Sequence, residues 1–346
     1  MTALRSGIGT LALVALTACA PPDPDGADGP GGPGMSGATV ESDLPRARPL
    51  PEPSEESRAL AARYARVEAD LRTRGLLRTD GGGVDAPYDA EMLTRNFVKI
   101  ALFDEFVPIS GRLVARETSS HLRRWESPVR IALDFGPSVP PDQRERDRAT
   151  VAQLADRLAV ASGHDITTTR RGGTMTVFVV NEEERRALGT RLRAEVPGVS
   201  EDVLRTVRDM APSTFCLMIA FSTDSAPHVY TRAIGIVRAE HPPLLRMSCF
   251  HEEIAQGLGL ANDSPEARPS IFNDDEEYAL LTTQDELLLA ILYDDRLNPG
   301  MTALEALPIV RTIAQELLPD ERAAQARPSA PSAARPPAPT PTAGDT

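Results

Sequence analysis

Residues 129–136 (VRIALDFG) alternate between apolar and polar positions, with Val129, Ile131, Leu133 and Phe135 on one face. An alternation of period two is typical of a β-strand that buries one side. Strands are also predicted by three further stretches, residues 174–180, 215–223 and 230–240. We expect the last two to pair through a turn near DSAPH at 224–228, within a small mixed sheet.

Helical patterns precede, separate and follow these strands. The first helix begins after the capping residue Ser54, and the second, over residues 88–106, buries a side that includes Phe97 and Ile100. The other predicted helices are residues 142–162, residues 182–195, a motif-bearing helix from about 249, and a final helix at 283–297. N-terminal helices, a segment of strands and helices, and a long motif-bearing helix together predict an α+β fold.

The composition changes at both ends of the chain. Proline and glycine dominate residues 19–52, and proline and alanine dominate residues 319–346. Neither segment shows apolar periodicity, so we expect a disordered tether and a disordered tail. The expected organisation is a signal segment at 1–18, the tether at 19–52, a helical segment at 53–122, a domain with the sheet and the motif at 123–318, and the tail at 319–346.

The first residues have the pattern of an export signal, with Arg5 followed by an apolar run that ends near Ala18. This run is shorter than the roughly 20 apolar residues of a membrane-spanning helix. The sequence Leu16-Thr17-Ala18-Cys19 resembles a bacterial lipobox, which implies a lipoprotein with palmitate on Cys19. An ordinary secretory signal with a chance cysteine is the alternative.

Ala20, and not aspartate, follows the lipidated position. By resemblance to the sorting signals of Gram-negative bacteria, this favours the cell outer membrane, with the protein facing the periplasm. The membrane is then a partner through the lipid anchor.

The charge and the cysteines limit the partners and the chemistry. A formal net charge of −13 argues against nucleic acid, which selects basic surfaces. With lipid on Cys19, the two other cysteines form an even pair in an oxidising compartment, so we expect a Cys216–Cys249 disulfide. Two buried thiols are the alternative, and no CxxC spacing supports a metal site that uses both.

The stretch CFHEEIAQGLGLANDS at 249–264 carries the candidate chemistry. On a helix Glu252 and Gln256 share a face, with Glu253 beside them. Glycines near the helix end allow Asn262 or Asp263 to return toward that face. These oxygen donors favour one hard divalent cation, or no metal, because zinc prefers nitrogen and thiolate ligands.

The same spacing resembles the active-site helix of metzincin peptidases. In that register Glu252, Gln256 and Asn262 replace the three metal ligands, and Glu253 keeps the place of the catalytic glutamate. LGL at 258–260 matches the turn of that family. The resemblance implies a zincin (metzincin)-like α+β domain with a degenerate motif.

A register that starts at His251 fails, because Ala255 then stands where a second histidine is needed and has no donor atom. His251 is then expected to be an ordinary residue at the helix start. Residues 281–294 (LTTQDELLLAILYD) resemble the helix that closes matrixin-type domains.

A closer resemblance covers residues 88–301. NFVKIALFDEF, the motif with the sequence that follows it up to NPGMT, and the upstream Cys216 resemble an uncharacterised family of bacterial lipoproteins with a domain of unknown function. This resemblance implies no known activity.

Three hypotheses for the function follow. In the first, the domain is a non-catalytic binding protein that holds an envelope protein or peptide in the former substrate cleft. Its polar helix face bonds internally, and Glu252 and Glu253 favour the helix N-terminus. In the second, it is a metal-dependent, peptidase-like hydrolase with Glu253 as general base, and Glu252, Gln256 and Asn262 or Asp263 hold the cation. The third hypothesis is a purely structural role.

Overall fold

The structure is a computed structural model that describes residues 50–109, 112–273 and 275–319, without the side chains of residues 105–117. The predicted signal segment, Cys19, most of the predicted tether and nearly all of the predicted tail lie outside the described residues.

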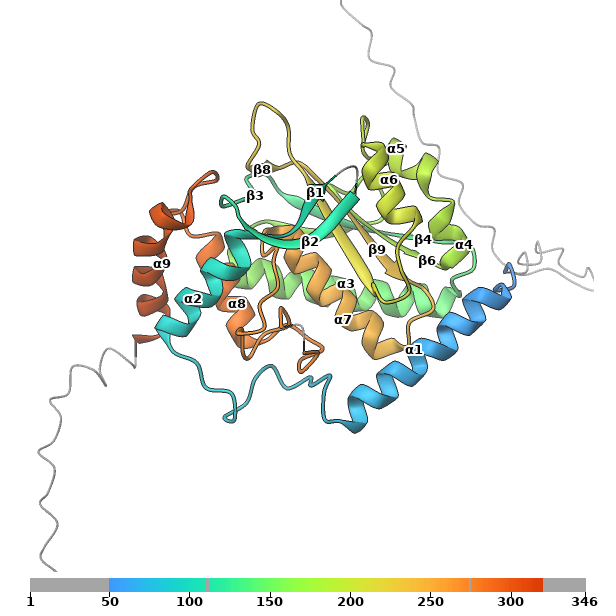
Figure 1. Ribbon diagram of the computed structural model, residues 1–346, viewed down its shortest axis with the longest axis horizontal. Coiled ribbons are helices and arrows are strands. Elements are labelled where there is room, and N and C mark those ends of the chain that lie inside the picture. Colours follow the sequence, from blue (N-terminus) through green and yellow to red (C-terminus); the bar gives the residue numbers. More distant parts are fainter. Residues whose placement is uncertain (1–49, 110–111, 274, 320–346) are drawn as a thin grey trace, which may run out of the picture. The chain divides into compact units, whose positions relative to one another are not determined.

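Nine helices and nine strands occur in this part of the chain (Figure 1). The helices are α1 (Glu55–Thr73), α2 (Ala90–Ala101), α3 (Pro141–Ser162), α4 (Glu182–Arg186), α5 (Gly189–Glu195), α6 (Glu201–Arg208), α7 (Pro243–Leu258), α8 (Thr283–Leu292) and α9 (Ala303–Leu317). The strands are β1 (Phe103–Ile109), β2 (Arg112–Ser119), β3 (Arg124–Trp125), β4 (Val129–Phe135), β5 (Ile166–Thr169), β6 (Met175–Val180), β7 (Cys216–Phe221), β8 (Val229–Tyr230) and β9 (Arg232–Arg238).

The main sheet has five strands in the order β5-β4-β6-β9-β7. Its first four strands are parallel to one another, and β7 runs antiparallel to β9 at one edge. Strands β1 and β2 form a separate antiparallel pair, and β3 pairs with β8 in parallel. The prediction of an α+β fold with a small mixed sheet is therefore confirmed.

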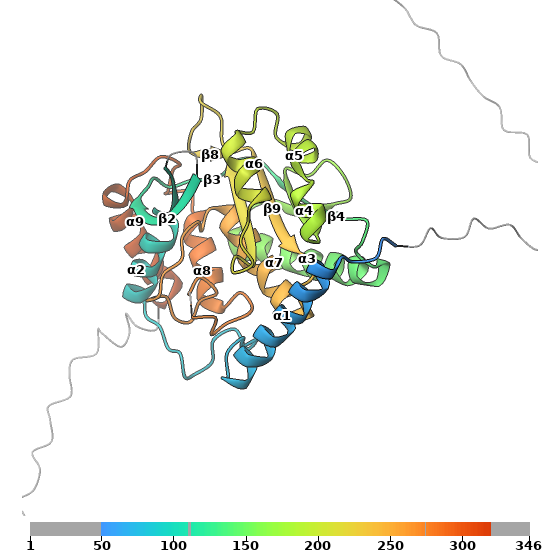
Figure 2. The ribbon, with the colours of Figure 1, turned by 45° about the vertical axis from the view of Figure 1, so that its right-hand side comes forward.

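Helices cover both faces of this sheet (Figures 1 and 2). Because side chains alternate along a strand, Val177 and Phe178 of β6 point to opposite faces. Val177 belongs to the core cluster that includes residues of α3 and α7, whereas Phe178 packs in a second cluster with residues of α5 and α6. The motif helix α7 is thus held against one face of the sheet by a shared core.

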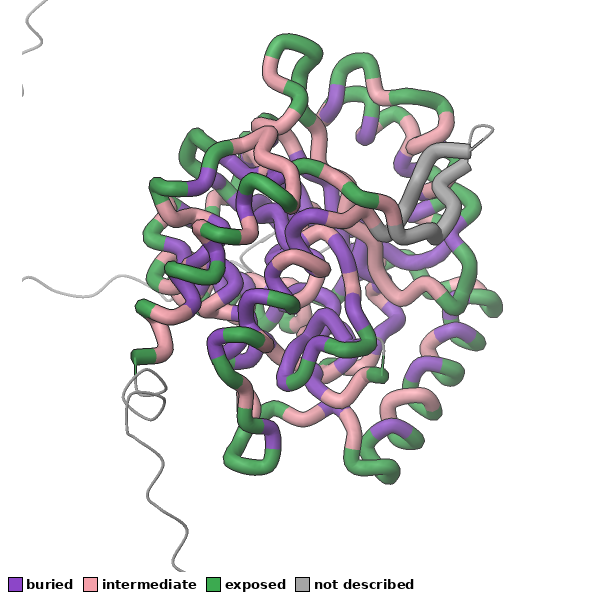
Figure 3. The backbone as a smooth tube through the Cα atoms, turned by 60° about the vertical axis from the view of Figure 1, so that its left-hand side comes forward, coloured by how far each residue is buried: buried purple, intermediate pink, exposed green. Residues whose placement is uncertain are grey.

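The larger core cluster also joins the N-terminal and C-terminal helices. Phe97 of α2, Leu289 of α8 and Ile313 of α9 belong to the cluster that contains Val177. This core therefore takes residues from both sides of the boundary that was predicted at residue 122, between the helical segment and the domain with the sheet. Figure 3 shows the buried positions gathered in the interior of the described chain, with exposed residues around them.

The predicted helix at 88–106 is too long. Helix α2 ends at Ala101, and the chain enters β1 at Phe103, where it pairs with β2. The long-range ladder to residues 112–119 overrides the local helical pattern here. The predicted helix at 182–195 is two short helices, interrupted around Ala187 and Leu188.

Several elements were not predicted, among them α6, the β1–β2 pair, β5 and α9. For α9 a local signal was present, because Thr302 and Glu305 form a capping box at its start. Helix α9 contains Pro308, which weakens a purely helical pattern. Strands β3 and β8, of two residues each, are too short to give a pattern of their own.

Candidate functional site

A cleft of about 440 Å³ lies between the edge strand β7 and helix α7. Half-buried residues of β7 line one side, and Glu252, Glu253 and Gln256 of α7 line the other. Asp263, from the loop after α7, also lines this β7–α7 cleft. The fold therefore brings together four of the five residues that the sequence motif suggested as ligands or base.

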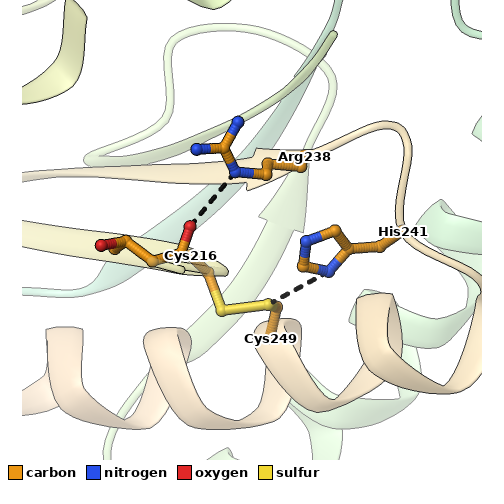
Figure 4. Close-up of a disulfide and its surroundings, with 5 residues drawn as sticks. Cys216, Arg238, His241 and Cys249 are labelled. Atoms are coloured by element: carbon orange, nitrogen blue, oxygen red, sulfur yellow. Dashed lines mark hydrogen bonds between the residues drawn. A yellow bond between two sulfur atoms is a disulfide. The ribbon is translucent and has the colours of Figure 1, made fainter. Parts of the chain in front are cut away.

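A disulfide ties the two walls of the cleft together at one end (Figure 4). It joins Cys216, the first residue of β7, to Cys249 of α7, with their Cα atoms 5.8 Å apart. These are the two cysteines that the sequence analysis paired. Arg238, on the neighbouring strand β9, donates from Nε to the carbonyl oxygen of Thr214 at 3.2 Å. This hydrogen bond holds the backbone just before β7 in place.

His241 lies beside this disulfide, with Nδ1 3.8 Å from the Sγ atom of Cys249. Its ring also packs at 4.5 Å, between centroids, from the ring of Tyr64 in α1. Burial, reinforced by the positive charge of Arg238, lowers the pKa of His241 to about 3. The imidazole is therefore neutral at pH 7 and acts as a packing group.

The polar face of α7 makes contacts within the protein. Gln256 donates from Nε2 to Oδ1 of Asp263 at 3.1 Å, so this amide helps to hold the loop that follows the helix. Glu253 is 5 % exposed and lines the cleft. The expectation that Glu252 and Glu253 favour the helix N-terminus is wrong, because α7 begins at Pro243 and both lie in its second half.

The end of α7 is fixed by side chains from other elements. Trp125 donates from Nε1 to the carbonyl oxygen of Gly257 at 2.8 Å, and the hydroxyl of Tyr293 donates to that of Leu258 at 2.9 Å. Gly259 then has φ 127°, and a Cβ atom there would lie 2.3 Å from the carbonyl oxygen of Arg123. Only glycine fits this close approach without distortion.

Asn262 does not line the cleft. It is 2 % exposed, and its Nδ2 donates to the carbonyl oxygen of Lys99 at 2.9 Å, while its backbone N–H donates to that of Ile100 at 3.0 Å. Asn262 thus attaches the loop after α7 to the end of α2. Of the two residues that the sequence left open for this position, the structure brings Asp263 to the cleft.

His251 is buried within α7 and is not a helix-start residue, so that expectation is wrong. Its Nδ1 accepts the backbone N–H of Leu281 at 3.1 Å. Burial, with a smaller contribution from the positive charge of Arg157, lowers the pKa of His251 to about 4. This histidine links the motif helix to the segment that leads into α8.

Asp285 organises the segment before α8. Its carboxylate accepts hydrogen bonds from the hydroxyl of Ser270 at 2.6 Å and from the backbone N–H groups of Ile271 at 3.0 Å and Thr282 at 2.7 Å. Burial raises the pKa of Asp285 to about 6, although these hydrogen bonds oppose the shift. The sequence 281–294 therefore contains a buried structural carboxylate in addition to its helix.

Two cleft residues were not predicted as site residues from the sequence, although Asp104 lies within NFVKIALFDEF. Asp104, in β1, and Arg123 form an ion pair and both line the cleft. They precede the motif by more than a hundred residues, and neither belongs to a recognisable spacing. Only the fold places them beside α7.

Within the described ranges, no group of three His, Cys, Asp or Glu side chains is arranged to hold a metal ion. The same part of the chain contains no helix that is both long and apolar enough to cross a membrane.

A family model described as "Protein of unknown function (DUF2927)" matches residues 90–312, which include the sheet, α7 and the cleft. No curated protein and no solved structure matches the chain.

Proposed function

The chain belongs to the protein family of unknown function DUF2927, and from that premise we propose that it is a non-catalytic envelope protein that binds an extended peptide segment of another envelope component in the β7–α7 cleft. We further propose that lipid on Cys19 anchors it to the outer membrane, facing the periplasm.

The observation that carries the binding proposal is the position of β7. This strand is at the edge of the main sheet, pairs with β9 on one side and lines the cleft on the other. An edge strand presents backbone N–H and C=O groups that an incoming extended segment can pair with. Pockets on either side of such a segment then select its side chains.

The placement of α7 supports a zincin-like ancestry. The helix that resembles the metzincin motif lies directly beside this edge strand and shares its cleft. The hydrogen bond from Gln256 to Asp263 supports the interpretation that the motif is degenerate. Gln256 stands at a ligand position of the metzincin motif, but here its side chain holds the neighbouring loop. The binding surface would then remain after the catalytic function was lost.

The donor set does not fit zinc. Glu252, Gln256 and Asp263 offer only oxygen atoms, one of them from a neutral amide, whereas zinc sites use mainly imidazole nitrogen and thiolate sulfur. Asn262 is directed to the backbone of α2 instead. We therefore derive no catalytic step through a zinc ion.

A peptide titration tests the binding proposal. Short fluorescein-labelled peptides of basic, neutral and acidic composition are titrated with the full chain, and binding is followed by fluorescence anisotropy. We expect at least one class of peptide to bind. Ala261→Trp, which places a large side chain in the cleft, should weaken this binding roughly ten-fold or more. Ala65→Trp, on the exposed side of α1, is the matched control and should change nothing.

Two results would overturn this proposal. If no class of peptide binds, the cleft is not a peptide site. If Ala261→Trp and Ala65→Trp bind equally well, the peptide binds elsewhere on the molecule. Mass spectrometry of the recovered peptide should show it intact.

Metal-dependent hydrolysis is the second candidate, and it is favoured by the burial of Glu253 in the cleft wall next to Glu252. Elemental mass spectrometry on the chain purified without chelator measures the metal content directly. Stoichiometric metal that is lost in a Glu252→Ala/Gln256→Ala double variant would support this candidate. Peptide cleavage abolished by Glu253→Gln, with unchanged folding, would establish it over simple binding.

A further inference from the structure

A second cavity lies at the opposite edge of the main sheet, between helix α3 and strands β4 and β5. Its volume is about 280 Å³. Apolar side chains form its floor, Ile131 and Leu133 from β4 and Val151 and Ala152 from α3. Three of these belong to the main core cluster, so the cavity reaches the core from the side of the molecule remote from β7.

The register of the sheet explains why the core is open here. Thr168 of β5 is the ladder partner of Ile131, and paired residues lie on the same face of a sheet. A threonine therefore stands at the edge where a larger apolar side chain would continue the core. Strand β5 has only four residues, and Thr168 leaves part of the space between β5 and α3 unfilled.

The charges around this cavity are of one sign. Arg148 and Arg170 line it, and no acidic residue does. Neither arginine takes part in an ion pair with any residue of the described ranges. The guanidinium carbon of Arg148 lies 4.6 Å from the ring centroid of Phe135, on the same strand as Ile131 and Leu133.

The chain has a net charge of −13, and many of its other arginines form salt bridges with carboxylates, as Arg78 does with Asp85 and Arg246 with Asp147. Here Arg148 and Arg170 line a cavity that also has an apolar floor. An anion with a short apolar body matches both features, because guanidinium groups bind carboxylates by charge-assisted hydrogen bonds and the floor buries hydrocarbon.

We propose that this α3–β5 cavity binds a small amphiphilic carboxylate, with the carboxylate at Arg148 and Arg170 and its hydrocarbon chain on Ile131, Leu133 and Val151. A water-sized group takes about 30 Å³ of liquid volume, so the cavity holds roughly nine such groups. That size corresponds to a short fatty acid. The inference does not depend on the β7–α7 cleft.

Isothermal titration calorimetry of the full chain with octanoate is the test. Octanoate binds at one site, and Arg148→Ala and Arg170→Ala each weaken binding roughly ten-fold or more, since each removes a charge-assisted hydrogen bond. Arg130→Ala is the matched control, because Arg130 is an exposed arginine on β4 that does not line the cavity. It leaves the affinity within about two-fold.

Further ligands and one further variant separate the contributions. Octan-1-ol and acetate, which lack the charge and the chain respectively, bind at least ten-fold more weakly than octanoate. Ala152→Leu fills the floor without changing the charge and also weakens octanoate. The proposal is overturned if octanoate does not bind, if octanol or acetate binds equally well, or if Arg130→Ala has the same effect as Arg148→Ala.

Discussion

At the scale of single residues, Gly259 decides how the motif helix ends. Its positive φ and the close carbonyl oxygen of Arg123 leave no room for a side chain. We predict that Gly259→Ala lowers the free energy of unfolding by about 3 kcal/mol, from backbone strain together with the steric clash. Urea unfolding followed by circular dichroism measures the change.

Gly198 is the control for that substitution. It also has a positive φ, 84°, but a Cβ atom there meets nothing within 4 Å. Gly198→Ala should therefore cost only about 1–2 kcal/mol, the backbone contribution alone. Equal losses for the two variants would contradict the role assigned to the contact with Arg123.

The lowered pKa of His251 predicts how the free energy of unfolding changes with pH. Its pKa falls from an ordinary 6.5 to about 4 in the folded protein. Below pH 6.5 the unfolded chain binds a proton that the folded chain does not bind until about pH 4. The free energy of unfolding therefore decreases as the pH falls through this window, by about 1.4 kcal/mol per pH unit.

His251→Asn isolates this effect, because an asparagine oxygen can accept the N–H of Leu281 without titrating. Between pH 6.5 and about pH 5, wild type should lose about 2 kcal/mol relative to the variant. The raised pKa of Asp285 acts in the opposite direction between 3.8 and about 6, but it is common to both proteins. Parallel pH profiles from urea unfolding would refute the assignment.

At the scale of elements, β7 and α7 form one unit because a disulfide joins them across 33 residues of chain. We predict that Cys216→Ala/Cys249→Ala lowers the free energy of unfolding by about 3–4 kcal/mol in the chain-entropy account. A reductant should lower the urea midpoint of wild type and leave that of the double variant unchanged. An unchanged midpoint for reduced wild type would show that the crosslink contributes little.

The elements that were predicted correctly are those whose pattern reflects their own burial. Strand β4 alternates because Val129, Ile131, Leu133 and Phe135 enter the main core whereas Arg130, on its other face, is exposed. Helix α3 ends before Gly163, which has φ 66°. The prediction failed at residues 103–106, where a local helical pattern competes with a ladder to β2. A strand that depends on a partner elsewhere in the chain leaves a weaker local signal.

At the scale of the whole molecule, the lipid anchor is the main prediction. In bacteria grown with an alkyne analogue of palmitate, the wild-type chain should be labelled and sediment with the outer membrane. Cys19→Ser should lose the label and appear in the soluble periplasmic fraction, because a single residue carries the acyl attachment. Labelling that persists in Cys19→Ser would refute the lipobox interpretation.

The sequence by itself determined the α+β class, most of the buried strands and helices, and the group of polar residues around Glu252 and Gln256. These features depend on periodicity and short spacing, which are local. Only the tertiary structure decided that Asp263 lines the cleft while Asn262 is bound to α2, and that Asp104 and Arg123 join the site. The same holds for the edge position of β7, because neighbours that are remote in sequence are set by how the whole core packs.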